Sequence, residues 1–458
     1  MKVIICGAGQ VGYHIARHLA AEGHDIAVVD QSPELVRRIG DSLDVQPHVG
    51  FGSHPDVLQR AGAADADMII AVTYSDEVNM VACQVAHSMF NVPTKIARVR
   101  SQTYLDPVWA DLFSRNNMPI DVIISPEMEV ARAISGRLNV PGAFETIALV
   151  DGRVRAMGVR CHDDCPVINT PLRQLSGLFP DLEIIVVGIV RDGEGFVPSP
   201  SDQMLAGDEV YFVTKTEHVT RAMTVFGHEE SVARRIIIAG GGNIGTFLGG
   251  IIEREHPGVS AKIIEKNAER AHRVADILER TVVINGDVID PEIMAEAGVA
   301  ECEAIIAVTN DDETNILASL LAKRHGTQRA VTLVSNATYA PLITSLGIDV
   351  VVSPRAITVS TILQHVRRGR IRQVHSLGDE FGELIEAEIM ETSGLTGKSI
   401  AEAELPPGVM FGAVVRGDEV IMPRSDTVMR VNDRVVLFAL TSAIKAVEKL
   451  FTVRLEFF

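Results

Sequence analysis

Two glycine-rich segments of the chain have the spacing needed to hold a phosphate group against the backbone. The first is GAGQVG, from Gly7 to Gly12, and the second is GGGNIG, from Gly240 to Gly245. In the pattern Gly-x-Gly-x-x-Gly the first glycine allows a tight turn and the second lets backbone amides approach a pyrophosphate. The third lets a helix pack close to a sheet. The N-terminus of that helix adds positive potential for the phosphates.

A carboxylate follows each glycine segment at the end of the next strand-like run, Asp30 in the first half and Glu265 in the second. An acid about 20 residues after the glycines can accept both hydroxyls of a ribose, which favours NAD(H) over NADP(H). The alternative is that the glycines form only strand–helix turns in a fold without a ligand. We predict two dinucleotide sites, which contain these residues: Gly7, Ala8, Gly9, Gln10, Val11, Gly12 and Asp30; and Gly240, Gly241, Gly242, Asn243, Ile244, Gly245 and Glu265.

Polar residues follow the fourth strand-like run of each half, beginning with Thr73 and Thr309. Ligands of doubly wound folds lie beyond the carboxyl ends of the strands, so these threonines are candidates to contact ribose or phosphate. The acids that follow them, and Asn79 and Asn315, can equally cap the next helices. Both interpretations stay open at this point.

Two arginines end the fifth strand-like run of the first half. Arg98 and Arg100 lie in the sequence ARVR, and a basic pair at this edge suits a ligand phosphate through charge-assisted hydrogen bonds. Surface salt bridges are the alternative for either arginine. The aligned positions of the second half are Leu333 and Ser335, so we predict that the two sites differ and that the first is the better phosphate sensor.

The segment CHDDC, from Cys161 to Cys165, has residue types that bind metals. A structural zinc site usually needs four ligands from two paired clusters, and the sequence has no second cluster. We therefore expect no metal and predict that this segment is a turn.

The composition is that of an ordinary folded protein with a strongly acidic charge. The 458 residues include 60 acidic and 42 basic ones, a formal net charge of −18. This charge argues against nucleic acid as the main partner and against direct docking on anionic lipid. Glycines interrupt the most apolar stretch, Ile236 to Ile252, so we expect no membrane-spanning helix. Five scattered cysteines and no signal-like first segment favour the cytoplasm.

An internal duplication determines the predicted architecture. AVTYSDEVN, from Ala71 to Asn79, recurs as AVTNDDETN, from Ala307 to Asn315, at nearly the same offset as the glycine segments. In each half, buried-type apolar runs alternate with helical patterns, which predicts an α/β fold with two tandem Rossmann-type, doubly wound parallel sheets. Each is followed by a small α+β lobe. The predicted boundaries are 1–123 and 232–351 for the Rossmann domains, and 140–226 and 371–453 for the lobes.

Short strands separated by turns indicate the lobes. In the first lobe we predict strands over Glu183–Val190, at Met204 and over Tyr211–Val213, and in the second over Val409–Val415, Val428–Val431 and Arg434–Leu440. Helices over Glu127–Leu138 and Arg355–Val366 connect each Rossmann domain to its lobe, and we expect them to be the moving joints.

Together, the glycine motif with Asp30, the block AGAADADMIIAVTYSDEVN, ARVR and the small lobe resemble RCK domains, regulators of potassium conductance. Two such domains in one chain resemble the tandem-RCK regulators of Trk potassium uptake over essentially the whole length. The resemblance implies NAD(H) binding, and binding of ATP or ADP. By analogy the contacts extend to Thr73, Tyr74 and Arg98, and in the second half to Thr309 and Asn310.

The same resemblance implies a regulatory role without catalysis. It implies a cytoplasmic homo-oligomer, a tetrameric ring, that lies peripherally on the cytosolic face of the inner membrane. Its expected partner is an integral membrane potassium-translocating subunit of the TrkH type. The main alternative is an NAD-dependent oxidoreductase, but the lobes have no convincing acid/base residue, since His162 and His375 are isolated. A redox-sensing repressor would need a basic helix-turn-helix, which the sequence lacks.

Overall fold

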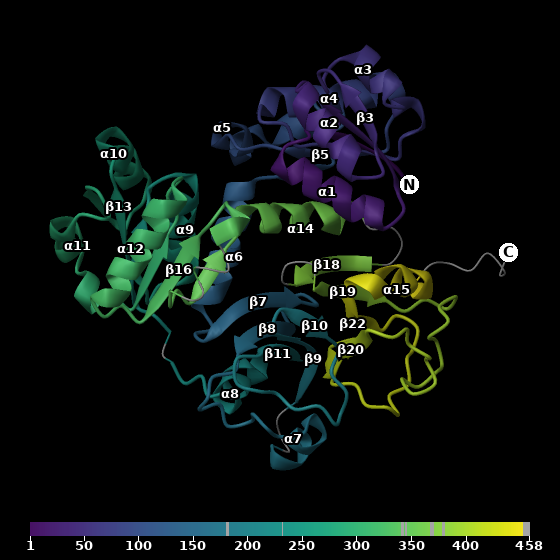
Figure 1. Cartoon of the computed structure of the whole chain (residues 1–458). Coiled ribbons are helices and arrows are strands. Elements are labelled where there is room, and N and C mark those ends of the chain that lie inside the picture. The colour runs from purple at the N-terminus through teal and green to yellow at the C-terminus, as the bar shows by residue number, and fades with distance from the viewer. Residues whose placement is uncertain are drawn as a thin grey trace. The chain divides into compact units, whose positions relative to one another are not determined.

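The computed structural model describes residues 1–179, 183–230, 232–339, 343, 346–366, 371–377 and 381–451. Within these ranges the chain forms two parallel sheets, each followed along the chain by an antiparallel sheet (Figure 1). The fold class predicted from the repeats and the apolar runs is therefore confirmed.

The first parallel sheet has the strand order β3-β2-β1-β4-β5-β6, that of a doubly wound dinucleotide fold. Strands β1 and β4 are buried along almost their whole length, as in a sheet covered on both faces. The strands are β1 (Lys2–Cys6), β2 (Asp25–Asp30), β3 (Gln46–Val49), β4 (Met68–Ala71), β5 (Thr94–Arg98) and β6 (Val122–Ile124). The helices are α1 (Gln10–Ala21), α2 (Pro33–Ser42), α3 (Pro55–Arg60), α4 (Asp76–Phe90), α5 (Gln102–Leu105) and α6 (Pro126–Leu138), with 3-10 turns η1 (Ala63–Asp65) and η2 (Pro107–Phe113).

The second parallel sheet repeats this order as β14-β13-β12-β15-β16-β17. Its strands are β12 (Arg235–Ala239), β13 (Ser260–Glu265), β14 (Val282–Asn285), β15 (Ala304–Ala307), β16 (Arg329–Leu333) and β17 (Val350–Val352). The helical segments are α9 (Asn243–Glu255), α10 (Ala268–Ile277), α11 (Pro291–Ala297), η4 (Val299–Glu301), α12 (Asp312–Arg324), η5 (Ala337–Tyr339) and α14 (Pro354–Val366).

Each lobe is a five-stranded antiparallel sheet with short helices. The first has the order β10-β9-β11-β8-β7 and the second β18-β19-β22-β20-β21. The first lobe consists of β7 (Ala143–Leu149), β8 (Val154–Arg160), α7 (Leu172–Leu178), β9 (Ile184–Arg191), β10 (Glu194–Phe196), β11 (Glu209–Lys215), η3 (Thr216–His218) and α8 (Val219–Val225). The second consists of β18 (Ile371–Leu377), β19 (Gly382–Glu388), β20 (Val409–Arg416), β21 (Glu419–Ile421), β22 (Arg434–Leu440), η6 (Thr441–Ala443) and α15 (Ile444–Phe451).

Two of the strand predictions for the lobes, at Met204 and over Val428–Val431, are wrong. Met204 lies in a loop beside a single bridge between Pro171 and Gln203, and in Val428–Val431 only Val428 makes an isolated bridge, to Ser399. Met204 and Met429 are nevertheless fully buried. Their apolar side chains fix the loops to the lobe cores without forming a hydrogen-bonded ladder, and this burial produced the strand-like pattern.

The chain divides into two compact units that differ from the two sequence halves. The first comprises Met1–Ala131 and Ser353–His365, and the second comprises Arg132–Val352 and Val366–Phe458. Helix α14 comes from the second half, yet most of it belongs with the first Rossmann domain, where Arg355 approaches Gln10 at 3.5 Å.

The last turns of α6 belong with the second Rossmann domain. Ser135 Oγ lies 2.9 Å from His256 Nε2, and Arg329 donates to the carbonyls of Arg137 and Ala143. The predicted connecting helices α6 and α14 thus each leave their own Rossmann domain and join the other compact unit.

Within the second unit the two lobes share an apolar core. Leu149, Val187 and Val213 of the first lobe pack in one cluster with Leu384 and Val436 of the second. Phe381 of the second lobe lies over Gly188 and Gly195 of the first, where a Cβ atom would come within 2.6 Å and 2.0 Å of its ring. Larger residues at these two positions are excluded, because the aromatic ring occupies the space.

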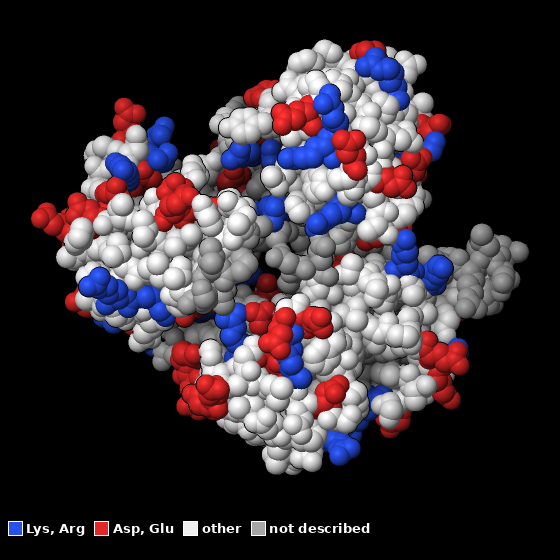
Figure 2. All heavy atoms as spheres, in the orientation of Figure 1, with Lys and Arg blue, Asp and Glu red and all other residues white. Residues whose placement is uncertain are grey.

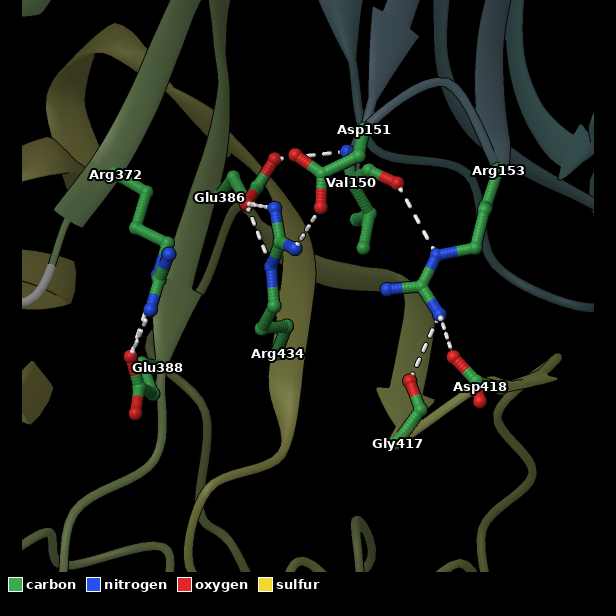
Figure 3. A network of polar contacts seen from close by, with 9 residues as sticks. All are labelled: Val150, Asp151, Arg153, Arg372, Glu386, Glu388, Gly417, Asp418 and Arg434. Carbon is green, nitrogen blue, oxygen red and sulfur yellow. Dashed lines mark hydrogen bonds and ion pairs between the residues drawn. The ribbon is translucent and has the colours of Figure 1, made fainter.

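A polar network crosses the same lobe contact (Figure 3). The carboxylate of Glu386 on β19 is fully buried and accepts hydrogen bonds from the Val150 N–H at 2.9 Å and from Arg434 Nε at 3.0 Å. Arg434 also pairs with Asp151. Val150 and Asp151 both have positive φ, 50° and 56°, which is unfavourable for a β-branched residue. The second lobe therefore holds a strained turn of the first.

No helix among the residues that the structure describes is long and apolar enough to cross a membrane. On the face that Figure 2 shows, acidic and basic side chains are interspersed over the described surface.

Candidate functional site

The glycine loops have the geometry that their sequence predicts. Gly7 and Gly240 have φ of +115° and +110°, values that favour glycine, and each lies against the backbone that follows the fourth strand of its sheet. A Cβ atom on Gly12 would lie 1.8 Å from the Gly7 carbonyl oxygen, and one on Gly245 would lie 1.9 Å from that of Gly240. These third glycines therefore allow helices α1 and α9 to start against the loop.

We expect Gly12→Ala to destabilise the first Rossmann domain by about 3 kcal/mol or more, because the methyl group meets rigid backbone. Thermal or urea unfolding of the full chain measures this loss. Gly9→Ala is the matched control, since a Cβ atom there has no neighbour within 4 Å. Equal stability of the two variants would contradict the assigned role of Gly12.

In the first half, Asp30 is attached to the glycine loop by hydrogen bonds. Its Oδ2 accepts from the Ala8 N–H at 2.7 Å and its Oδ1 from the Ser32 N–H at 2.8 Å. Within the described ranges each carboxylate oxygen therefore has one protein donor and keeps one lone pair for a ligand hydroxyl.

In the second half, Glu265 accepts more hydrogen bonds from the protein than Asp30 does. Its Oε2 accepts from the Gly241 N–H at 2.8 Å, while Oε1 accepts from both the Asn267 N–H at 2.7 Å and Arg270 Nη2 at 2.9 Å. Burial acts to raise the pKa of Glu265, but these hydrogen bonds outweigh it and hold the pKa below its usual value. Glu265 is thus a carboxylate at neutral pH, with its Oε1 already saturated by the protein.

The threonines after the fourth strands are fixed by buried asparagines. Asn79 Oδ1 accepts from the N–H and the hydroxyl of Thr73, and its Nδ2 donates to the carbonyls of Thr73 and Arg98. Asn315 does the same for Thr309 and Leu333. The two asparagines are therefore not helix caps but cross-links between the ends of two neighbouring strands.

The helix caps are other residues of the same segments. Ser75 caps α4 through the Val78 N–H at 3.3 Å, and Asp311 caps α12 through the Thr314 N–H at 2.7 Å. Each threonine hydroxyl donates its hydrogen within the protein, so toward a ligand Thr73 and Thr309 can act only as acceptors.

The two arginines of the first half have different surroundings. Arg100 forms an ion pair with Glu127 at the start of α6, at 2.8 Å, and its guanidinium lies 5.7 Å from the ring centre of Tyr74. Tyr74 is 86% exposed. Arg100 thus already has an ion-pair partner, and its contact with a ligand phosphate stays a prediction.

Arg98 donates from Nη2 to the Thr73 carbonyl at 2.7 Å, and its buried Nε has no hydrogen-bond partner among the residues that the structure describes. Burial, followed by the charge of Arg100, lowers the pKa of Arg98. A ligand anion beside Arg98 would stabilise its charged form and so oppose both effects on its pKa.

A pocket of about 390 Å³ lies at the carboxyl edge of the second parallel sheet. It brings together the predicted residues Gly240, Gly242, Glu265, Thr309 and Asn310. The pocket also contains Lys266, Arg270 and Asp287, which the sequence analysis missed. The sequence contains a signal for them, since Lys266 directly follows the predicted acid Glu265.

The segment from Cys161 to Cys165 is a loop with a turn at Asp163 and Asp164, as predicted. Both cysteines are free thiols buried in the core of the first lobe. The pocket residues lie in the second Rossmann domain, and this segment lies in the first lobe.

Comparison with known domain families defines the class of protein. The TrkA-N domain model matches residues 3–126 and 236–354, and the TrkA-C domain model matches residues 157–227 and 384–452. The fold, the two glycine loops and these matches define a chain of two TrkA-N domains, each followed by a TrkA-C domain.

Full-length relatives identify the family. The Trk system potassium uptake protein TrkA of Azorhizobium caulinodans is 54% identical over 458 residues, with 100% of both chains covered. That of Halomonas elongata is 41% identical over 462 residues, again with 100% of both chains covered. The chain belongs to the TrkA family of Trk system potassium uptake proteins, and the resemblance noted from its sequence is confirmed.

Solved structures have the same fold at lower identity. The GsuK RCK domain matches with a TM-score of 0.59 at 20% identity and covers 98% of this chain and 94% of that one. The GsuK channel bound to NAD matches with a TM-score of 0.59 at 19% identity, with 98% and 78% covered. At these identities the likeness supports the RCK fold alone.

Proposed function

We propose that this chain is the nucleotide-sensing regulatory subunit of a Trk-type potassium uptake system. The observation that carries the proposal is the repeated pairing of a glycine loop with a carboxylate hydrogen-bonded to it, in a chain 54% identical over its full length to a Trk potassium uptake protein. Such a loop presents backbone amides and a helix N-terminus to a pyrophosphate, while the carboxylate faces the ribose.

The proposed ligands are NAD(H) and ATP or ADP. The GsuK channel bound to NAD has the same fold and supports NAD(H) as a ligand of this chain. In the first half, Asp30 has one free lone pair on each oxygen for the ribose hydroxyls, and the unpartnered Arg98 Nε supplies a donor for phosphate. Thr73, Tyr74 and the first glycine loop complete the proposed site, with Gly240 to Gly245, Glu265, Thr309 and Asn310 as the second.

We propose that nucleotide binding serves regulation without catalysis. An oxidoreductase needs an acid or base beside the nicotinamide. Among the pocket residues Lys266 is the one His, Lys or Tyr side chain, and its ion pair with Asp287 raises its pKa, so it stays protonated. Burial lowers the pKa of His375, in the second lobe, to about 4. Steady hydride transfer from NADH to small carbonyl compounds would overturn this part of the proposal.

The partner in this proposal is an integral membrane potassium-translocating subunit of the TrkH type. Sensing domains without an effector domain must act on another protein, and closed symmetric rings multiply such domains, here as a proposed tetramer on the cytosolic face of the inner membrane. A ligand regulates a partner only if it binds the two states of the assembly unequally. Helices α6 and α14 are the proposed joints, because each begins in one compact unit and ends in the other.

Deleting the gene for this chain should cripple potassium uptake at low external potassium, and the wild-type gene should restore it. Growth and radiotracer or rubidium uptake in potassium-limited medium measure the effect. Normal uptake by the deletion strain under these conditions would exclude the proposed function, whereas uptake at high external potassium is the control for general fitness.

We expect Arg98→Ala to weaken ATP or ADP binding at the first site by about ten- to a hundredfold, since one charge-assisted hydrogen bond is lost. Calorimetry on the full chain measures this. Arg100→Ala is the comparison, because Arg100 already pairs with Glu127 and should contribute less to the ligand. If both variants bind nucleotides as wild type does and instead dissociate as oligomers, the arginines belong to a subunit interface.

A further inference from the structure

The two candidate sites differ most at the edge that faces the adenosine ribose. The cap geometry aligns them: the Leu35 N–H donates to Ser32 Oγ as the Arg270 N–H donates to Asn267 Oδ1. The residue after the acid is accordingly Gln31 in the first half and Lys266 in the second. Arg270 of the second half thus stands where the first half has Leu35.

A third position of this edge also has a charged residue in the second half and an uncharged one in the first. The Gly50 N–H donates to the Asp30 carbonyl and the Gly286 N–H to the Glu265 carbonyl, so the next residues, Phe51 and Asp287, are equivalent. Among the residues that the structure describes, no cation pairs with Asp30, so the ribose edge of the first site has one uncompensated acid. The edge of the second has two acids and two bases, which pair as Glu265–Arg270 at 2.9 Å and Lys266–Asp287 at 2.8 Å.

This arrangement changes what each edge can accept. At the first edge a phosphate on the ribose would meet the bare charge of Asp30, and like charges this close repel. At the second edge Glu265 is neutralised by Arg270, and its Oε1 already has two protein donors, so it is poorly placed to accept a second ribose hydroxyl.

The two cations of the second edge are open to solvent and keep N–H donors for a ligand. The side chains of Lys266 and Arg270 are 79% and 44% exposed. Within the part of the chain that the structure describes, each donates to its carboxylate from one nitrogen, so other N–H groups can reach a ligand phosphate while both ion pairs stay in place. An arginine can bind such a phosphate through two parallel hydrogen bonds. A basic side chain beside the acid of a dinucleotide fold is also the device that accommodates a 2′-phosphate.

We propose that the second site binds adenine nucleotides that carry a phosphate on the adenosine ribose, as NADP(H) does, and that Lys266 and Arg270 select for that phosphate. This rests on the proposed nucleotide binding and revises the expectation that the acid of the second half selects NAD(H). The chain would then bind two different nucleotides. The one in the first half has no phosphate on its adenosine ribose, and the one in the second half has such a phosphate.

The test uses the full chain with the substitution Gly9→Asp, which is expected to abolish nucleotide binding at the first site. Calorimetry compares 5′-AMP, adenosine 2′,5′-bisphosphate and adenosine 3′,5′-bisphosphate, and then NAD⁺ and NADP⁺. We expect the 2′,5′-bisphosphate to bind about tenfold or more tightly than 5′-AMP, and NADP⁺ to exceed NAD⁺ by a similar factor. Tighter binding of the 3′,5′-bisphosphate instead would support a ribose phosphate of the coenzyme A type.

The matched variant carries the residues of the first half, Lys266→Gln with Arg270→Leu. It should lose the advantage of the ribose phosphate and keep binding of 5′-AMP, which shows that the variant is folded. If wild type binds 5′-AMP and NAD⁺ but a ribose phosphate brings no gain, the inference is wrong and nucleotide sensing stands. If no nucleotide binds to this site, both the inference and the proposed function of the second half fail.

Discussion

Replacing Gly9 with aspartate should abolish nucleotide binding at the first site while leaving the fold intact. A Cβ atom on Gly9 has no neighbour within 4 Å, and φ is −67°, so the backbone accepts any residue there without strain. The new carboxylate points into the space where the pyrophosphate is proposed to lie. At roughly 5 Å and an effective dielectric constant of about 20, the repulsion is about 3 kcal/mol per phosphate charge, or at least a hundredfold in affinity.

Calorimetry with NADH, ADP and ATP on the full chain measures the loss, and circular dichroism with thermal unfolding confirms that the variant is folded. Gly242→Asp is the matched variant of the second site, because Gly242 is equally free of neighbours and has φ of −70°. Each variant should remove one class of sites and leave the other. A folded Gly9→Asp protein with wild-type NADH affinity and stoichiometry would show that the first glycine loop is only a structural turn.

Replacing Glu386 with leucine should weaken the contact between the two lobes by about 3–5 kcal/mol. Among the described residues, the change leaves Arg434 with only the exposed Asp151 as a partner and leaves the Val150 N–H, at a strained turn, without an acceptor. Glu386→Gln should be milder, because an amide oxygen can still accept from Val150.

Hydrogen exchange measured by mass spectrometry reports this contact directly, through the peptide that contains the turn at Val150. We expect fast exchange there in Glu386→Leu, together with a lower midpoint of urea unfolding. Asp418→Ala is the control: Asp418 also reaches across the lobe contact, to Arg153 at 3.5 Å, but it is fully exposed and should contribute little. Wild-type protection of the Val150 turn in Glu386→Leu would show that the apolar core alone holds the lobes together.

The sequence by itself determined the local and repeated features of this protein. The glycine loops, the acids at Asp30 and Glu265 and the strands of both parallel sheets depend on neighbouring residues, because apolar runs, turn residues and helix starts are set by short-range conformational preferences. The equivalence of Leu333 with Arg98 also followed from the repeat, and the matching hydrogen bonds from Asn315 and Asn79 agree with it.

Only the tertiary structure decided which of these residues contact one another. The partners of Arg98 and Arg100, the role of Asn79 and the pairing of Arg270 with Glu265 depend on which strand ends meet at one edge of a sheet. Burial made Met204 and Met429 look like strand residues, although they anchor loops. Helix α14 belongs to the same compact unit as the first Rossmann domain, and Glu386 supports the turn at Val150. Both contacts join residues more than 200 positions apart in the sequence. Such long-range packing leaves no local pattern from which it could be predicted.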